Sequence, residues 1–118
     1  MIIMAINITN SVKFKVLKNG YHRLTLDYGN TYSDGSFHKG IDLTGNPNVN
    51  NGYDDIVAFD DGVVAAMCNT YSKNGKAGGT ADMGNYVIID HGNGYRTRYH
   101  HMAKGSVTVK KGQTVKAG

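Results

Sequence analysis

The sequence predicts an all-β fold, an antiparallel sheet assembled from short strands. Several runs have strand composition, and some of them alternate apolar and polar side chains. Sixteen glycines against one proline in 118 residues indicate many tight turns. No window sustains a helical period, and hydrophobic residues still make up 40% of the chain, which is enough for one core.

The first half of the chain contains two predicted strands followed by loops. Residues 11–18 alternate apolar and basic side chains, which is typical of an edge strand, and residues 1–20 are expected to form an N-terminal extension that includes it. An Asn-Gly turn then leads into a second strand over residues 21–28. Residues 29–40 and 45–54 are rich in Gly, Asn and Asp and predict loops.

The middle of the chain predicts a tight hairpin and a long loop. Two apolar stretches, residues 56–59 and 63–67, flank the turn signal Asp60-Asp61-Gly62. Residues 69–84 follow as a polar, glycine-rich loop. A loop of that length either serves a function or is a surface excursion, and both interpretations remain open.

The clearest hairpin joins residues 85–90 to residues 95–101 through a Gly-Asn-Gly turn. Residues 107–109 and 115–117 predict two further short strands. Strict alternation along the second arm places one set of side chains on a common face: Tyr95, Thr97, Tyr99 and His101. The other face then carries Arg96, Arg98 and His100.

Charge and composition limit the classes of partner. The formal net charge is +4, which favours anionic surroundings such as nucleic acid, a membrane surface or a cell wall. The basic residues are scattered, so we expect no nucleic-acid partner. No apolar run approaches the roughly 20 residues of a membrane span, so we expect no membrane insertion. The N-terminus has no signal-peptide pattern, and Cys68, the single cysteine, can form no internal disulfide.

His38 and Asp42 could share a metal ion. In a straight strand, residues four apart face the same way but lie about 13 Å from each other. Zinc ligands must each come within roughly 2.0–2.2 Å of one ion, so the chain has to bend between the two residues. Gly40, at the midpoint, permits such a bend. The alternative is an exposed histidine beside an aspartate that stabilises a turn.

A second cluster, Tyr99-His100-His101-Met102, adds a candidate general acid or base. Alternation places only one of the two histidines on the face of Tyr99, so we do not expect them to act together. A histidine beside a metal could orient water or stabilise a developing oxyanion, and the alternative is a surface residue. His91, in the turn, is expected to be structural, and His22 has no evident partner.

Five blocks occur in one order along the chain: residues 38–42, 61–64, 84–95, 99–102 and 111–118. Together they resemble the lysostaphin/LytM-type zinc endopeptidases, which cut peptide cross-links in bacterial peptidoglycan. The resemblance covers roughly residues 24–118 and implies a peptidase domain over residues 21–118. It further implies a central antiparallel sheet that floors a groove walled by loops, with action in the cell wall or outside the cell. The absence of a signal-peptide pattern also fits a phage-associated protein.

The resemblance also implies roles for individual residues. His38 and Asp42 match the first two ligands of a Zn²⁺ ion, and His101 matches the catalytic histidine of a Tyr-x-His motif. Tyr32 matches a tyrosine that in some members helps to stabilise the tetrahedral intermediate. The substrate would be a peptide of peptidoglycan.

The chain departs from the family after the Gly-Gln-x-Val-x-x-Gly block at residues 112–118, because no His-x-His motif follows. That motif supplies the third zinc ligand, so we expect the chain to be an incomplete catalytic domain. A downstream segment or another chain would then supply the ligand. Two alternatives are a non-catalytic relative that binds cell wall or regulates a hydrolase, and a biotinyl- or lipoyl-type carrier. A carrier needs a lysine at a hairpin tip, which is absent from these turns.

Overall fold

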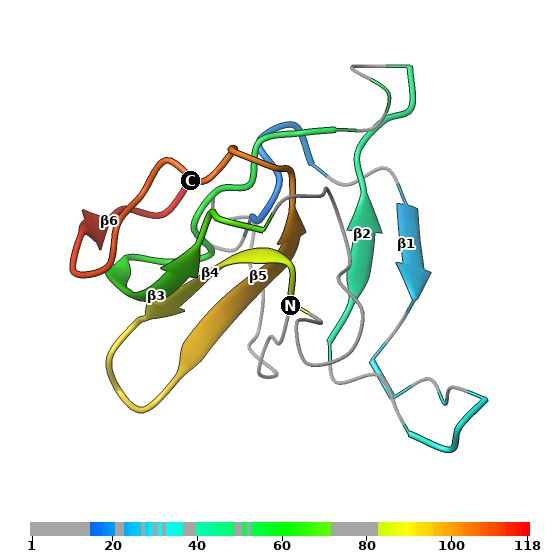
Figure 1. The fold of residues 1–118 in the computed structure, drawn as a ribbon, viewed down its shortest axis with the longest axis horizontal. Coiled ribbons are helices and arrows are strands. Elements are labelled where there is room, and N and C mark those ends of the chain that lie inside the picture. Colours follow the sequence, from blue (N-terminus) through cyan, green and yellow to red (C-terminus); the bar gives the residue numbers. More distant parts are fainter. Residues whose placement is uncertain are drawn as a thin grey trace. The chain divides into compact units, whose positions relative to one another are not determined.

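The computed structural model is built from strands alone over the residues that it describes (Figure 1). The described residues are 15–20, 23–26, 28–29, 31, 33–36, 40–48, 51, 53–71 and 83–118. The chain divides into two compact units, Met1–Phe59 with Ala117–Gly118, and Asp60–Lys116. Both described sheets are antiparallel, which confirms the predicted all-β fold. No helix among the described residues has the length and hydrophobicity needed to cross a membrane.

The first unit contains a two-stranded sheet made of β1, Arg23–Leu26, and β2, Asp42–Thr44. β1 lies within the strand predicted over residues 21–28. Its register pairs Leu24 with Leu43 and Leu26 with Asp42, so one step on β2 faces two steps on β1. The extra residue on β1 forms a β-bulge directly opposite the start of β2.

The predicted hairpin between residues 56–59 and 63–67 is wrong. Ile56 forms an isolated antiparallel bridge with Leu17, and the Val57 N–H donates to the Val16 carbonyl oxygen at 2.9 Å. The backbone of this segment therefore bonds to a segment about forty residues earlier. The second arm forms β3, Gly62–Cys68, which pairs with two other strands.

The second unit contains a four-stranded sheet in the order β5-β4-β3-β6. The predicted hairpin is confirmed as β4, Asn85–Asp90, and β5, Arg96–Met102. β6 is shorter than predicted and covers only Thr114–Val115. It pairs with the first residues of β3, so two segments about fifty residues apart lie side by side at that edge.

Residues 107–109 do not form the predicted strand. The side-chain amide of Asn69 replaces a strand partner at Val107, because its Nδ2 donates to the Val107 carbonyl at 3.3 Å and its Oδ1 accepts from the Val107 N–H at 3.2 Å. A buried backbone requires such partners, whether they come from a strand or from a side chain. Val107 is buried at this position.

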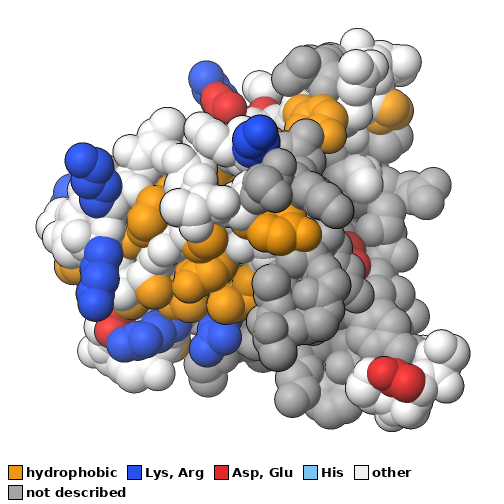
Figure 2. All heavy atoms as spheres, in the orientation of Figure 1, with side chains coloured by type: hydrophobic (Ala, Val, Ile, Leu, Met, Phe, Trp, Pro, Cys, Tyr) orange, Lys and Arg blue, Asp and Glu red, His pale blue; other side chains and the backbone are white. Residues whose placement is uncertain are grey.

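The core of the second unit lies on one face of the four-stranded sheet. The buried side chains of that face are Val64, Val87, Ile89, Thr97 and Tyr99. Complete burial of an aliphatic side chain of this size contributes about 1.5–3 kcal/mol. Figure 2 shows hydrophobic side chains gathered over this sheet and bordered by Lys and Arg side chains.

The sheet packs so closely at Gly62 that only glycine fits. A Cβ atom there would lie 2.5 Å from the Asp90 carbonyl oxygen and 2.7 Å from Cγ2 of Ile89. Real Cβ atoms do not approach backbone oxygen this closely, so a larger residue would push β3 away from β4. Gly62 therefore sets the close pairing of these two strands.

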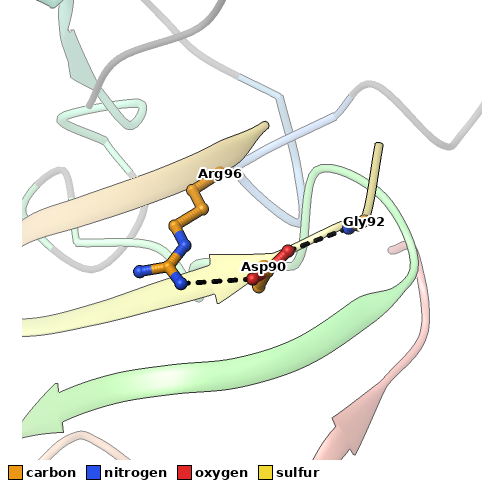
Figure 3. Close-up of polar contacts among 3 residues, drawn as sticks. All are labelled: Asp90, Gly92 and Arg96. Carbon is orange, nitrogen blue, oxygen red and sulfur yellow. Dashed lines mark hydrogen bonds and ion pairs between the residues drawn. The ribbon is translucent and has the colours of Figure 1, made fainter. Parts of the chain in front are cut away.

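Asp90 ties the β4–β5 turn together (Figure 3). Its carboxylate accepts the Gly92 N–H at 2.9 Å and pairs with Nη2 of Arg96 at 3.2 Å. The Gly92 N–H, followed by the charge of Arg96, lowers the pKa of this carboxyl group below its usual value. Asp90 is thus a charged anchor for the hairpin that leads to His101.

Candidate functional site

The structure describes two of the four residues that the sequence nominates. Asp42 begins β2 in the first unit, and His101 lies near the end of β5 in the second unit. His38 and Tyr32 lie outside the described residues. Asp42 and His101 are therefore each described within their own unit.

Asp42 stands at a bend followed by a bulge. The backbone bends at the buried Gly40, two residues before Asp42. Asp42 then pairs with Leu26 directly beside the extra residue of β1. Bulges often occur next to functional sites because they re-aim a side chain. The Asp42 side chain is half-buried.

His101 also stands at a bulge. β5 pairs Tyr99 with Val87 and Met102 with Asn85, so His100 and His101 together oppose a single residue, Tyr86. The backbone of His101 is left-handed, with φ at 61°. Non-glycine residues rarely adopt this conformation, and it is found where the surroundings hold it in place.

The bulge alters the arrangement that strict alternation predicts. Thr97 and Tyr99 are 2% and 3% exposed, as expected for one buried face. His101, two residues further on, is exposed, so the predicted sharing of that face ends at Tyr99. One extra residue shifts the side-chain period, which is the general effect of a bulge. An exposed imidazole is accessible to a ligand.

His100 differs from His101 in its environment. Its ring meets that of Tyr86 edge-on, with centroids 6.4 Å apart, and its centroid is 6.1 Å from that of His101. Within the described part of the chain, its buried Nε2 atom has no hydrogen-bond partner. Burial lowers the pKa of His100 to about 4, so its ring is neutral at neutral pH. His101 is thus the better candidate for proton transfer.

His91 belongs to a chain of hydrogen bonds that leads from an exposed backbone carbonyl group to the buried hydroxyl groups of Thr97 and Tyr99. Its Nδ1 is 2.8 Å from the Asp61 carbonyl oxygen, and its Nε2 is 2.7 Å from Oγ1 of Thr97. That hydroxyl is in turn 2.6 Å from the hydroxyl of Tyr99. A carbonyl oxygen only accepts, so Nδ1 carries the proton and, in the neutral ring, Nε2 accepts from Thr97. The network agrees with the structural role predicted for His91.

The donor types of the two proposed ligands suit zinc, which takes imidazole nitrogen and carboxylate oxygen. His38 would supply the first and Asp42 the second. Among the residues that the structure describes, no group of three or more His, Cys, Asp or Glu side chains is placed to hold a metal ion. The donor types of the two residues therefore fit a zinc ion.

A comparison with family models assigns the chain to a family. The model of peptidase family M23 matches residues 36–118, well over half of the chain. The chain belongs to peptidase family M23. In this M23 chain the matched region contains His38, Asp42 and His101, whereas Tyr32 precedes it. Membership confirms the predicted resemblance to a family of peptidases.

Two curated relatives match a short part of this M23 chain. Peptidoglycan DD-endopeptidase ShyA of Vibrio cholerae is 60% identical over 35 residues, which are 30% of the chain and 8% of the relative. Peptidoglycan DD-endopeptidase ShyB of the same organism is 54% identical over 35 residues, with the same coverage. The matches thus span about 8% of the length of these relatives. No solved structure matches the chain significantly.

The residues that surround His101 were not predicted from the sequence. The Met83 carbonyl oxygen accepts the His101 N–H at 2.9 Å, and Asn85 pairs with Met102 on the far side of the bulge. The sequence signal was the Gly84-Asn85 pair at the start of the third block of the resemblance. In the sequence this pair predicts only a turn before a strand. Its position opposite the bulge at His101 is given by the pairing of β4 with β5.

Proposed function

We propose that this chain contributes the catalytic domain of a zinc-dependent endopeptidase that hydrolyses peptide cross-links of bacterial peptidoglycan. The observation that carries the proposal is that one M23 match contains His38, Asp42 and His101 together. The two relatives are both named peptidoglycan DD-endopeptidases, which supports peptidoglycan peptides as the substrate class. The proposed site of action is the cell wall, reached from outside the cell or as part of a phage.

The chain's own residues divide the work. His38 and Asp42 would be two of the ligands of a zinc ion, which when bound would supply the Lewis acidity for polarising a scissile carbonyl group. His101 moves a proton to or from the reacting group, since its side chain is exposed and its backbone is held by a hydrogen bond. Tyr32 donates a hydrogen bond to the oxyanion that develops on the substrate.

The charge of the protein favours this substrate. The formal net charge is +4, and cell walls carry anionic polymers and peptide carboxylates. A basic protein gains local concentration near such a surface, and the gain falls as salt screens the charges. Binding to purified sacculi should therefore weaken as ionic strength rises.

The test uses the full gene product that contains residues 1–118, with purified muropeptides as substrate. We expect His101→Ala to lower kcat/KM by about 10²- to 10⁴-fold, the usual contribution of a general acid or base. Zinc content should be retained in His101→Ala and lost in Asp42→Asn, because only the second removes a ligand. Arg98→Ala, an exposed change on the same strand, is the matched control and should alter neither quantity.

Two results would count against the proposal. Cleavage that survives His101→Ala would remove this residue from the mechanism. Binding to sacculi without cleavage, by a protein that contains zinc, would favour the non-catalytic relative instead. Mass spectrometry of the released muropeptides would identify the bond that is cut.

A further inference from the structure

Two residues of β4 and its approach hold the backbone of His101. Gly84 is buried and has a left-handed backbone with φ at 60°. It follows Met83, whose carbonyl oxygen accepts the His101 N–H at 2.9 Å. Glycine adopts this φ without steric cost, whereas other residues do so only under strain. Gly84 thus allows the chain to turn while Met83 stays bonded to the bulge.

Asn85, the first residue of β4, is held in place by hydrogen bonds of its buried side chain. It is 0% exposed, and its amide binds the backbone of Tyr71 twice. The Tyr71 N–H donates to Oδ1 of Asn85 at 2.9 Å, and Nδ2 of Asn85 donates to the Tyr71 carbonyl at 3.1 Å. This pattern imitates one rung of an antiparallel ladder. Asn85 also pairs with Met102, the residue that directly follows His101.

The two residues therefore bracket the bulge. The preceding carbonyl, that of Met83, bonds to His101, and Asn85 lies opposite the next residue of β5. A left-handed histidine tends to relax into the extended conformation unless neighbouring bonds prevent it. The hydrogen bond to Met83 depends on the turn that Gly84 makes directly after it, and the pairing with Met102 depends on Asn85, whose side chain is bonded to Tyr71.

We propose that Gly84 and Asn85 are positioning residues that hold His101 in its left-handed conformation, and thereby fix the direction from which its imidazole reaches the substrate. The catalytic part of this proposal rests on the proposed function. The structural part does not, because the conformation of His101 can be measured in a protein without activity.

The experiment compares Asn85→Ala with Asn69→Ala in the labelled 118-residue chain. Asn69 is the matched control because its amide binds the backbone of Val107 through the same pair of hydrogen bonds. NMR would report the three-bond HN–Hα coupling of His101 and the exchange rate of its amide proton. We expect Asn85→Ala to raise that exchange rate at least about tenfold, equivalent to about 1.4 kcal/mol of local opening. We expect the coupling of His101 to change in Asn85→Ala and to stay the same in Asn69→Ala.

Other outcomes would overturn the proposal. An unchanged His101 in folded Asn85→Ala would show that Asn85 does not hold it, and equal changes in both variants would show a general loss of stability. If Asn85→Ala fails to fold, Gly84→Ala provides the second variant. An alanine is strained at the φ of 60° that Gly84 adopts, so it displaces the preceding Met83 carbonyl oxygen from the His101 N–H. Unchanged coupling and exchange at His101 in Gly84→Ala would then refute the proposal.

Kinetics separates positioning from folding in the full gene product. A misplacement of the reacting group by about 1 Å can cost roughly 10²-fold in rate. Asn85→Ala should lower kcat on that scale with little change in KM, whereas Asn69→Ala should leave both near those of the unaltered protein. If the unaltered protein cleaves nothing, the proposed function fails, and the NMR comparison still decides whether Asn85 positions His101.

Discussion

The left-handed backbone of His101 predicts that glycine is more stable than alanine at position 101, the proposed catalytic position. At φ of 61° a residue with a Cβ atom is disfavoured, at a cost of roughly 1–2 kcal/mol. Glycine avoids that cost but loses about 0.5–1 kcal/mol relative to alanine through its larger freedom in the unfolded chain. The difference leaves His101→Gly more stable than His101→Ala by about 0.5–1 kcal/mol.

The same pair of substitutions at Arg98 serves as the control. Arg98 lies in a regular part of β5, pairs with Ile88 and is exposed. Without a left-handed backbone, only the unfolded-state term remains, so Arg98→Gly should be less stable than Arg98→Ala by about 0.5–1 kcal/mol. The sign of the glycine-minus-alanine difference therefore reverses between the two positions.

Urea unfolding of the four variants measures this reversal, since the free energy of unfolding follows from midpoint and slope. Each variant is compared with its partner at the same position, which cancels the loss of the original side chain. Alanine as stable as glycine at position 101 would refute the left-handed conformation. In the full gene product both His101 variants should also lose cleavage, so the more stable of the two gains nothing in function.

Three further predictions concern the surrounding sheet. Thr97→Val removes a buried hydroxyl that lies 2.7 Å and 2.6 Å from its two partners, and should lower the free energy of unfolding by about 2 kcal/mol in urea titrations; an unchanged value would exclude the network as a stabilising element. Gly62→Ala should cost about 3 kcal/mol or more because its Cβ would overlap β4, whereas Gly112→Ala, with φ at 89° and open space around it, should cost only about 0.5–1 kcal/mol. Equal thermal shifts for the two glycine variants would contradict the close approach. The His100 ring should titrate near pH 4 by NMR, because its pKa in the folded state lies below the ordinary 6.5. As the pH falls, the unfolded chain therefore takes up the proton first, and the stability present above about pH 6.5 should decline toward pH 4. A titration midpoint at the ordinary value would show that the ring is not buried.

Local patterns were sufficient to predict the β4–β5 hairpin. Its two arms are adjacent in sequence, have strand composition, and are joined by a glycine-rich turn that fixes their pairing. The assignment of Ile56 failed for the opposite reason. Its partner, Leu17, lies far away in sequence, and an apolar run carries no information about which distant strand it will join.

The bulges could not be predicted from the sequence. Alternation with a period of two gives the face of each side chain only while the strands stay in register. The extra residue opposite Tyr86 leaves no clear compositional signal, since a histidine in a run of strand residues fits a regular strand as well as a bulge. The prediction that His101 shares a face with Tyr99 followed the pattern correctly and failed at the first residue that breaks it.

The distribution of the bulges links fold and function. The described sheets contain three register shifts, and two of them adjoin residues within the M23 match that the resemblance assigns to the site: Asp42 and His101. Bulges interrupt regular ladder pairing and often occur next to functional sites, where they re-aim a side chain. At His101 the irregularity also includes a disfavoured φ that neighbouring hydrogen bonds maintain. Strain concentrated at the candidate catalytic residue, in an otherwise regular hairpin, is what selection for a fixed imidazole would produce. The departures from β geometry thus agree with the role proposed for His101.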